Sequence, residues 1–403
     1  MNIELMRFID KNFGIPLCLV CSIANRILKL FKCKTKSYKN ILIIELPEMG
    51  SALLSYTAIK YLKTQSPTAN IYFLTFTKNR ESIEILNIIP DDNIITISSD
   101  NLLKFLKDTI LTIFYFRKKK IDLIIDLEMF SRFSMIYSFL INPTDIAGFY
   151  MYNVEGLYRG KILTIKTNFN YYQHISENYL ALIQTIFNDN NEIPQLKKSI
   201  TQTIELPEIP INNNIVSKLK KQISECYHNY NGNTILIVIS PSGEEIPLRG
   251  WDYNNYAELI KLLLKNIDNA IVILTGTKTA TAQNQNLKNK INNERCIDFT
   301  GKTTLLELIQ LMHIAKILVT NDGGAAHFSA LTNIKSFVFF GPETPVLYRP
   351  LSDNATILFK NYNCSPCINI FNYRVSACKN NRCVNDYSSN ELFDMIIKST
   401  ATK

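Results

Sequence analysis

The sequence predicts an α/β protein made of two domains, each a doubly wound parallel sheet covered by helices. Short, continuous apolar segments alternate with helical segments, a pattern typical of buried parallel strands joined by helical crossovers. The chain has 403 residues, enough for two domains of ordinary size. A segment over 188–233, rich in Asn, Lys, Ile and Pro, separates the two halves and indicates the domain boundary.

Composition and charge limit the class of protein. Hydrophobic residues make up 46% of the chain, which provides for a sizeable core. The net charge of +9 suits acidic partners such as nucleotide phosphates, a phosphorylated glycan or anionic lipid. The chain carries no RNP or zinc-finger signature, so we expect no nucleic-acid partner. It also carries no cleavable signal pattern, so we expect a cytoplasmic protein with reduced thiols.

Residues 1–39 form a separate amphipathic helical leader. Apolar residues from Phe13 to Phe31 are interleaved with Arg26 and several lysines. The apolar run is interrupted before it reaches membrane-spanning length. Two interpretations fit: an interfacial helix that makes the protein peripheral on an anionic membrane surface, or a helix packed on its own protein.

The first domain covers residues 40–205. Its opening apolar strand leads through a turn into a helix that ends near residue 65, and further strands and helices alternate after it. We expect strands at 41–46, 71–76, 94–97, 121–127 and 147–149, and helices at 51–65, 80–87 and 100–118.

The second domain covers residues 206–388 and repeats the pattern. A C-terminal helix, within 389–403, is expected to cross the junction between the domains. We expect strands at 234–240, 270–275, 315–319 and 336–340, and helices at 214–228, 253–265 and 305–313.

The segment between the last two strands has the sequence NDGGAAHF. Asn321 and Asp322 are residue types that cap helices, and Gly323 and Gly324 allow a tight turn before the next helix. Free backbone N–H groups at such a helix start bind phosphate. On its own the turn fits a plain helix cap equally well.

Three stretches together resemble glycosyltransferase family nine, the heptosyltransferase-like enzymes. They are NDGGAAHFSALTNIKSFVFFGPETP, PSGEEIPLRGW and the opening ILIIELPEMGSALL. The resemblance implies the GT-B arrangement, in which two Rossmann-like domains face a cleft and the nucleotide sugar lies in the C-terminal domain. It implies an inverting, metal-independent transferase that moves a sugar, such as heptose from ADP-heptose, in lipopolysaccharide biosynthesis. The acceptor it implies is a lipopolysaccharide-type or lipid-linked glycan, or a protein.

The resemblance also assigns donor-site residues in the second domain. Arg249 takes the basic position that pairs with the diphosphate, Asp322 contacts sugar hydroxyls, and His327 supports the turn. For Arg249 the alternative is a surface ion pair, and for Asp322 and His327 it is local capping. After Gly276 the acidic residue usual in the family is missing, so another nucleotide sugar, or an epimerase, also fits. The remaining donor-site residues implied are Ser240, Ser242, Gly243, Thr275, Gly276, Gly323, Gly324 and Thr344.

The catalytic base is where the chain departs from the family. The resemblance puts an aspartate directly after the glycine of the first turn, and this chain has Gly50 followed by Ser51. Glu48 is the nearest carboxylate and therefore the candidate base. The alternative is a catalytically silent relative that binds a glycan or a partner protein as a scaffold.

Four cysteines gather near the C-terminus: Cys364, Cys367, Cys378 and Cys383. Clustered thiols in a reducing compartment predict one structural zinc or iron ion, and free cysteines in an irregular loop are the alternative. We expect no cofactor for catalysis.

Overall fold

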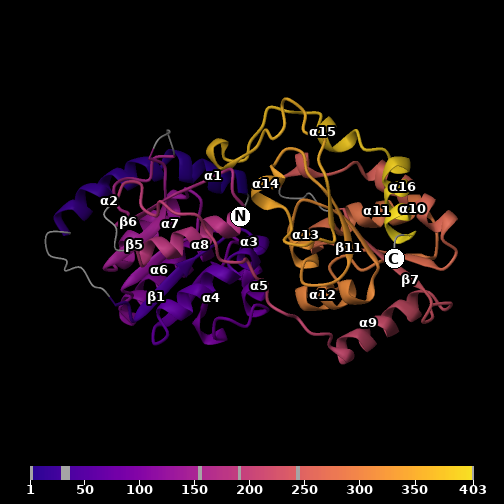
Figure 1. Ribbon diagram of the computed structural model, residues 1–403, viewed down its shortest axis with the longest axis horizontal. Helices are drawn as coiled ribbons and strands as arrows, with labels where there is room; N and C mark the ends of the chain where they lie inside the picture. Colours follow the sequence, from indigo (N-terminus) through magenta and orange to yellow (C-terminus); the bar gives the residue numbers. More distant parts are fainter. Residues whose placement is uncertain (1–2, 29–36, 153–156, 189–191, 242–245, 402–403) are drawn as a thin grey trace. The chain divides into compact units, whose positions relative to one another are not determined.

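The structure is a computed structural model that describes residues 3–28, 37–152, 157–188, 192–241 and 246–401 (Figure 1). The chain forms two compact units, Met1–Leu206 and Pro207–Lys403. Each unit contains one six-stranded sheet in which every pair of neighbouring strands is parallel. The predicted α/β class with two doubly wound sheets is confirmed.

The sheet of the first unit has the order β3-β2-β1-β4-β5-β6. The strand order reverses between β1 and β4, and ligands of open α/β sheets bind at the carboxyl ends of strands beside such a reversal. Buried Ile, Leu and Phe residues fill the central strands, as expected for a sheet covered on both faces. The strands are β1 (Asn40–Ile44), β2 (Asn70–Phe76), β3 (Ile94–Ile97), β4 (Leu123–Asp126), β5 (Asp145–Tyr150) and β6 (Ile165–Asn168).

Two predicted helices of the first unit differ from the structure, and two further helices, within 132–141 and 175–186, were not predicted. The helix expected at 51–65 is interrupted at Ser55, and the one expected at 80–87 ends at Glu84. The helices that follow β1 are α3 (Met49–Leu54), α4 (Tyr56–Gln65), α5 (Arg80–Glu84), α6 (Leu102–Lys119), α7 (Arg132–Ile141) and α8 (Ile175–Ile186).

The leader forms two helices, α1 (Ile3–Asn12) and α2 (Gly14–Leu28), and both contact α7. The Asp10 carboxylate accepts hydrogen bonds from the backbone N–H groups of Arg132 and Phe133, which fixes α1 to the start of α7. On α2 the buried stripe includes Cys18 and Cys21, which pack as core residues. Among the described residues, no helix combines the length and apolar character needed to cross a bilayer.

The sheet of the second unit has the order β12-β11-β10-β7-β8-β9, which reverses between β10 and β7. Trp251 is buried, stacks on Phe339 and donates its indole N–H to the Tyr387 carbonyl, so it is a packing residue. The strands are β7 (Ile235–Ser240), β8 (Ala270–Leu274), β9 (Cys296–Asp298), β10 (Ile317–Asn321), β11 (Lys335–Phe339) and β12 (Ala355–Leu358).

Helices cover both faces of this second sheet. The last of them, α16, packs on α10 within the same unit. The helices are α9 (Asn213–Cys226), α10 (Tyr253–Asn266), α11 (Thr281–Ile291), α12 (Leu305–Ile314), α13 (Gly324–Ser329), α14 (Pro345–Tyr348), α15 (Arg382–Asn385) and α16 (Ser389–Ala401).

Candidate active site

Polar residues gather at the carboxyl edge of the second sheet, beside the reversal of strand order. Ser240 ends β7, Thr275 follows β8, Asp322 follows β10, and Thr344 lies shortly after β11. Because neighbouring parallel strands end at the same edge, the predicted donor residues share one edge of this sheet although they are far apart in sequence.

Arg249 lies between two buried carboxylates. Its Nη2 atom is 2.9 Å from Oε2 of Glu343, and its Nε atom is 3.3 Å from Oδ2 of Asp322. The arginine side chain is 17% exposed, and the two carboxylates are 2% and 5% exposed. Arg374 adds a longer contact of 3.8 Å to Glu343. Charges this deeply buried are tolerated only when paired, so Arg249 holds both acids in place.

The electrostatics of this cluster follow from burial. Burial raises the pKa of Glu343 to about 7, and Arg249 offsets only part of that rise. Burial likewise raises the pKa of Asp322 against the opposing effect of Arg249. For Arg249, burial alone lowers the pKa, and Asp322 and Glu343 outweigh it to give a net rise. Arg249 therefore stays charged.

The expected capping by Asn321 and Asp322 is wrong. The N-cap of α13 is Gly323, and no side chain caps the helix. Asn321 instead accepts hydrogen bonds from the Trp251 backbone N–H and the Tyr256 hydroxyl. These longer-range contacts satisfy Asn321, and the ion pair with Arg249 engages Asp322.

The chain turns from β10 into α13 within two residues, Asp322 and Gly323, so the predicted tight turn is present. Gly323 has φ 173°, which is ordinary extended backbone. A Cβ atom added at Gly324 would have no atom within 4 Å, apart from those of the residue, its chain neighbours and its own helix backbone. The space in front of Gly324 is therefore open, so the glycine leaves the backbone accessible.

The remaining predicted donor residues differ in their contacts and burial. The Thr344 hydroxyl accepts a hydrogen bond of 3.2 Å from the Val346 N–H and caps α14. His327 is buried on α13. The Thr275 hydroxyl is buried without a hydrogen-bond partner among the described residues. The Gly276 carbonyl accepts from the Gly301 N–H. Ser242 and Gly243 lie outside the described residues.

Glu48 and Ser51 meet in the turn after β1. The Ser51 hydroxyl donates to Oε2 of Glu48 across 3.1 Å. Ser51 is buried and Glu48 is partly exposed. The two residues singled out in the sequence therefore form one contact at the carboxyl edge of the first sheet.

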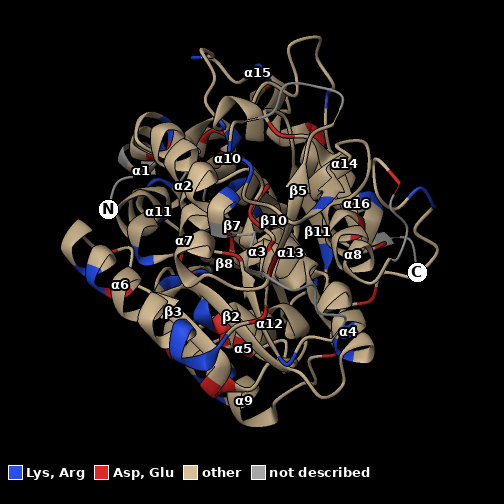
Figure 2. Ribbon diagram, turned by 90° about the vertical axis from the view of Figure 1, so that its left-hand side faces the viewer, with Lys and Arg blue, Asp and Glu red and all other residues tan. Residues whose placement is uncertain are grey.

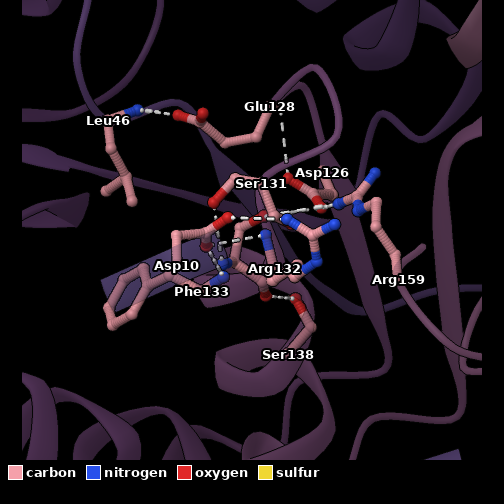
Figure 3. A network of polar contacts seen from close by, with 10 residues as sticks. Asp10, Leu46, Asp126, Glu128, Ser131, Arg132, Phe133, Ser138 and Arg159 are labelled. Carbon is pink, nitrogen blue, oxygen red and sulfur yellow. Dashed lines mark hydrogen bonds and ion pairs between the residues drawn. The ribbon is translucent and has the colours of Figure 1, made fainter. Parts of the chain in front are cut away.

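A second group of charged residues at this edge was missed from the sequence (Figure 3). Asp126 ends β4, is fully buried, and forms an ion pair with Arg159 from the segment between β5 and β6. It also accepts a hydrogen bond of 2.9 Å from the Ser134 hydroxyl. Glu128, two residues on, accepts a bond of 2.6 Å from the Leu46 N–H. The signal in the sequence was a pair of acids at the end of an apolar strand.

The four cysteines were predicted to hold a metal ion. Burial, followed by the thiols of Cys367, Cys378 and Cys364, raises the pKa of Cys383 to about 11. The four sulfur atoms thus lie in one region of the second unit. Across the described part of the chain, no three or more His, Cys, Asp or Glu side chains are grouped closely enough to hold a metal. The metal site stays a prediction.

Two parallel α/β units with polar residues at the strand edges define the GT-B class of fold. The chain belongs to glycosyltransferase family 9 (heptosyltransferase), because the model of that family matches residues 163–374, just over half of the sequence. Lipooligosaccharide heptosyltransferase 2 of Haemophilus influenzae is 27% identical over 199 residues, which are 48% of this chain and 54% of the relative. The chain thus spans about half the length of the curated relatives it matches.

Solved structures share the fold. Escherichia coli ADP-heptose LPS heptosyltransferase II matches with a TM-score of 0.65 at 17% identity, covering 90% of this chain and 100% of that one. A family 9 glycosyltransferase from Veillonella parvula matches with a TM-score of 0.64 at 17% identity, covering 91% and 97%. These likenesses extend over both units of the chain.

Proposed function

We propose that the protein is an inverting, metal-independent glycosyltransferase that moves heptose from ADP-heptose onto a lipopolysaccharide-type glycan. The observation that carries the proposal is Arg249, held between Asp322 and Glu343 at the strand edge where α/β folds bind ligands. Family membership supports it, and the relatives' names specify ADP-heptose and lipopolysaccharide. A lipid-linked glycan or a protein is the alternative acceptor.

The donor diphosphate requires positive charge and N–H groups as the sugar departs. Arg249 supplies charge-assisted hydrogen bonds, and its Nη1 atom bonds to no other described residue. The backbone at Gly323 and Gly324 and the Thr344 hydroxyl hold the phosphates, together with Ser240, Ser242 and Gly243. Asp322 accepts hydrogen bonds from sugar hydroxyls, and His327 supports the turn. Thr275 and Gly276 border the nucleotide.

An inverting transfer also needs a base for the proton of the acceptor hydroxyl. Glu48, in contact with Ser51, is the candidate drawn from the sequence. The second candidate function is a silent relative that binds a glycan or a partner protein. It is favoured by Ser51 in the position where the family resemblance places the catalytic aspartate.

Donor binding is tested by thermal unfolding with ADP-heptose, with UDP-N-acetylglucosamine as the control nucleotide sugar. A ligand that binds only the folded state, at a concentration a hundred times its dissociation constant, adds about 2.7 kcal/mol to the free energy of unfolding. We expect ADP-heptose to raise the melting temperature by about 5–10 °C, and heptose to appear on the glycan in a transfer assay. Stabilisation by the UDP-sugar alone would contradict the donor assignment. Stabilisation by ADP-heptose without transfer would favour the silent relative.

We also propose that the protein is peripheral on the cytoplasmic side of an anionic membrane. One stripe of α2 is buried against the first unit, and the remaining apolar side chains are exposed, with Val20 at 62% and Ile23 at 60%. Helix α6 exposes a second apolar stripe that includes Leu103 at 82% and Phe114 at 63%. Both helices contact α7, so the two stripes are carried by helices that share one neighbour. Apolar faces with basic residues bind anionic lipid surfaces.

We further propose one structural zinc or iron ion at Cys364, Cys367, Cys378 and Cys383. Elemental analysis of purified protein should find about one ion per chain, as a closed four-thiolate site requires. Cys364→Ser with Cys367→Ser should remove it, whereas Cys226→Ser, at an exposed cysteine elsewhere in the second unit, should not. Metal-free protein with all four thiols open to alkylation in the native state would contradict this proposal.

A further inference from the structure

Glu128 differs from the other carboxylates at the edge of the first sheet. It follows β4, which pairs with β1 beside the reversal of strand order. Its Oε1 atom accepts the 2.6 Å hydrogen bond from the Leu46 N–H, at the start of the turn after β1 (Figure 3). Its Oε2 atom bonds to no other described residue, and the side chain is partly exposed. One carboxylate oxygen is thus fixed by backbone and the other is left for a ligand.

The neighbouring acids lack this combination. Asp126 is fully buried and engaged by Arg159 and by Ser134, so it cannot reach a substrate. Glu48 accepts its 3.1 Å hydrogen bond from a side chain, the Ser51 hydroxyl. Glu45 is 3% exposed. Glu128 thus combines a hydrogen bond from the backbone with a partly exposed side chain.

The charges around Glu128 adjust its affinity for a proton. Burial, followed by the nearby Asp126, raises the pKa of Glu128 to about 8, and the Leu46 N–H and Arg159 act in the opposite direction. General bases work best with a pKa near the working pH. The charged and titratable groups that face Glu128 come from several elements: Asp10, Asp126, Arg159 and Tyr179.

We infer that Glu128, rather than Glu48, is the general base of the transfer. This inference rests on the proposed function. The acceptor oxygen forms a bond to the anomeric carbon of the sugar, while the bond from that carbon to the diphosphate oxygen breaks. The nucleoside diphosphate leaves with the electron pair, and the acceptor proton passes to Glu128. Solvent then takes the proton and restores the carboxylate.

The deciding experiment compares Glu128→Gln with Glu48→Gln. Glutamine keeps an oxygen that accepts from the Leu46 N–H but cannot take the proton. We expect Glu128→Gln to lower kcat about a hundredfold or more, the usual contribution of a positioned base, with unchanged melting temperature and unchanged stabilisation by ADP-heptose. Glu48→Gln should lower kcat less than Glu128→Gln does, and Asp92→Asn, at an exposed carboxylate of the same unit, is the neutral control that should leave kcat unchanged. Glu128→Asp, which retains a shorter carboxylate, should keep more activity than Glu128→Gln.

A pH profile separates a base from a merely structural residue. Since a base must be ionised, wild-type kcat should fall as the pH drops below about 8, the pKa of Glu128, and the residual kcat of Glu128→Gln should lack that limb. Unchanged turnover in Glu128→Gln, or a hundredfold loss confined to Glu48→Gln, would overturn the inference. A wild-type protein that binds ADP-heptose and transfers nothing refutes the proposed function instead, and the inference falls with it.

Discussion

Replacement of Arg249 by methionine is expected to abolish donor binding and to destabilise the second unit by about 3–5 kcal/mol. Methionine fills a similar volume without charge, so Asp322 and Glu343 are left buried without their common cation. The loss of a diphosphate contact should lower kcat/KM by about a hundredfold or more. Urea unfolding measures the stability, and thermal unfolding with ADP-heptose measures the binding.

The pH dependence of the stability of Arg249→Met shows whether unpaired charge or lost packing causes its loss of stability. Glu343 already has its pKa raised from 4.5 to about 7 in the folded protein, and loss of Arg249 raises it further. The folded state then binds protons more tightly than the unfolded state, so stability falls as pH rises above about 4.5. We expect the deficit of Arg249→Met to be smaller at pH 5 than at pH 8. An equal deficit at both would show that lost packing, and not unpaired charge, is responsible.

The matched control for Arg249→Met is Arg382→Met in the same unit. Arg382 also pairs with a carboxylate, Asp386, but its side chain is 67% exposed. Exposed pairs are screened by water and salt, so this variant should bind ADP-heptose and unfold as the wild type does.

The strands that form the core could be predicted because their sequences are continuously apolar. Residues 121–127 contain β4, which is buried along its length, and 234–240 contain β7, which is buried from its second residue on. Three edge strands were missed because each is short: β6, with sequence IKTN, β12, with sequence ATIL, and β9, with sequence CID. Helix interruption at Ser55 was also missed, since no Gly or Pro marks it.

Much of the candidate site could be placed from sequence, because topology alone brings strand ends together. The partners of the charged residues could not be placed. Glu343 meets Arg249 from 94 positions away, and Arg159 meets Asp126 from 33 positions away. Such contacts depend on side-chain packing and on the cost of burying a charge unpaired, and neither follows from local propensity. The same tertiary contacts overrode the predicted capping by Asp322.

The other large expected effect concerns the apolar stripes of α2 and α6 in the first unit. On α6, Leu103, Leu106, Ile110 and Phe114 recur at helical spacing on the side opposite to buried Phe105 and Phe116. The last turn of α6 carries Arg117, Lys118 and Lys119 (Figure 2). Each basic residue near an anionic membrane contributes about 1 kcal/mol to the free energy of membrane binding. Each apolar side chain that becomes buried in the membrane contributes about 1.5–3 kcal/mol.

Leu103→Glu combined with Phe114→Glu should therefore lower binding to phosphatidylserine-containing vesicles about a hundredfold or more in a flotation assay. The melting temperature should not change, because both side chains are exposed. Tyr172→Glu is the control, since Tyr172 is 77% exposed in the same unit but lies outside both helices. Deletion of residues 1–36 should weaken flotation through loss of α2. If the stripes instead join two copies of the chain, sedimentation without lipid would show a wild-type dimer that the double variant dissociates, and flotation would be unaffected.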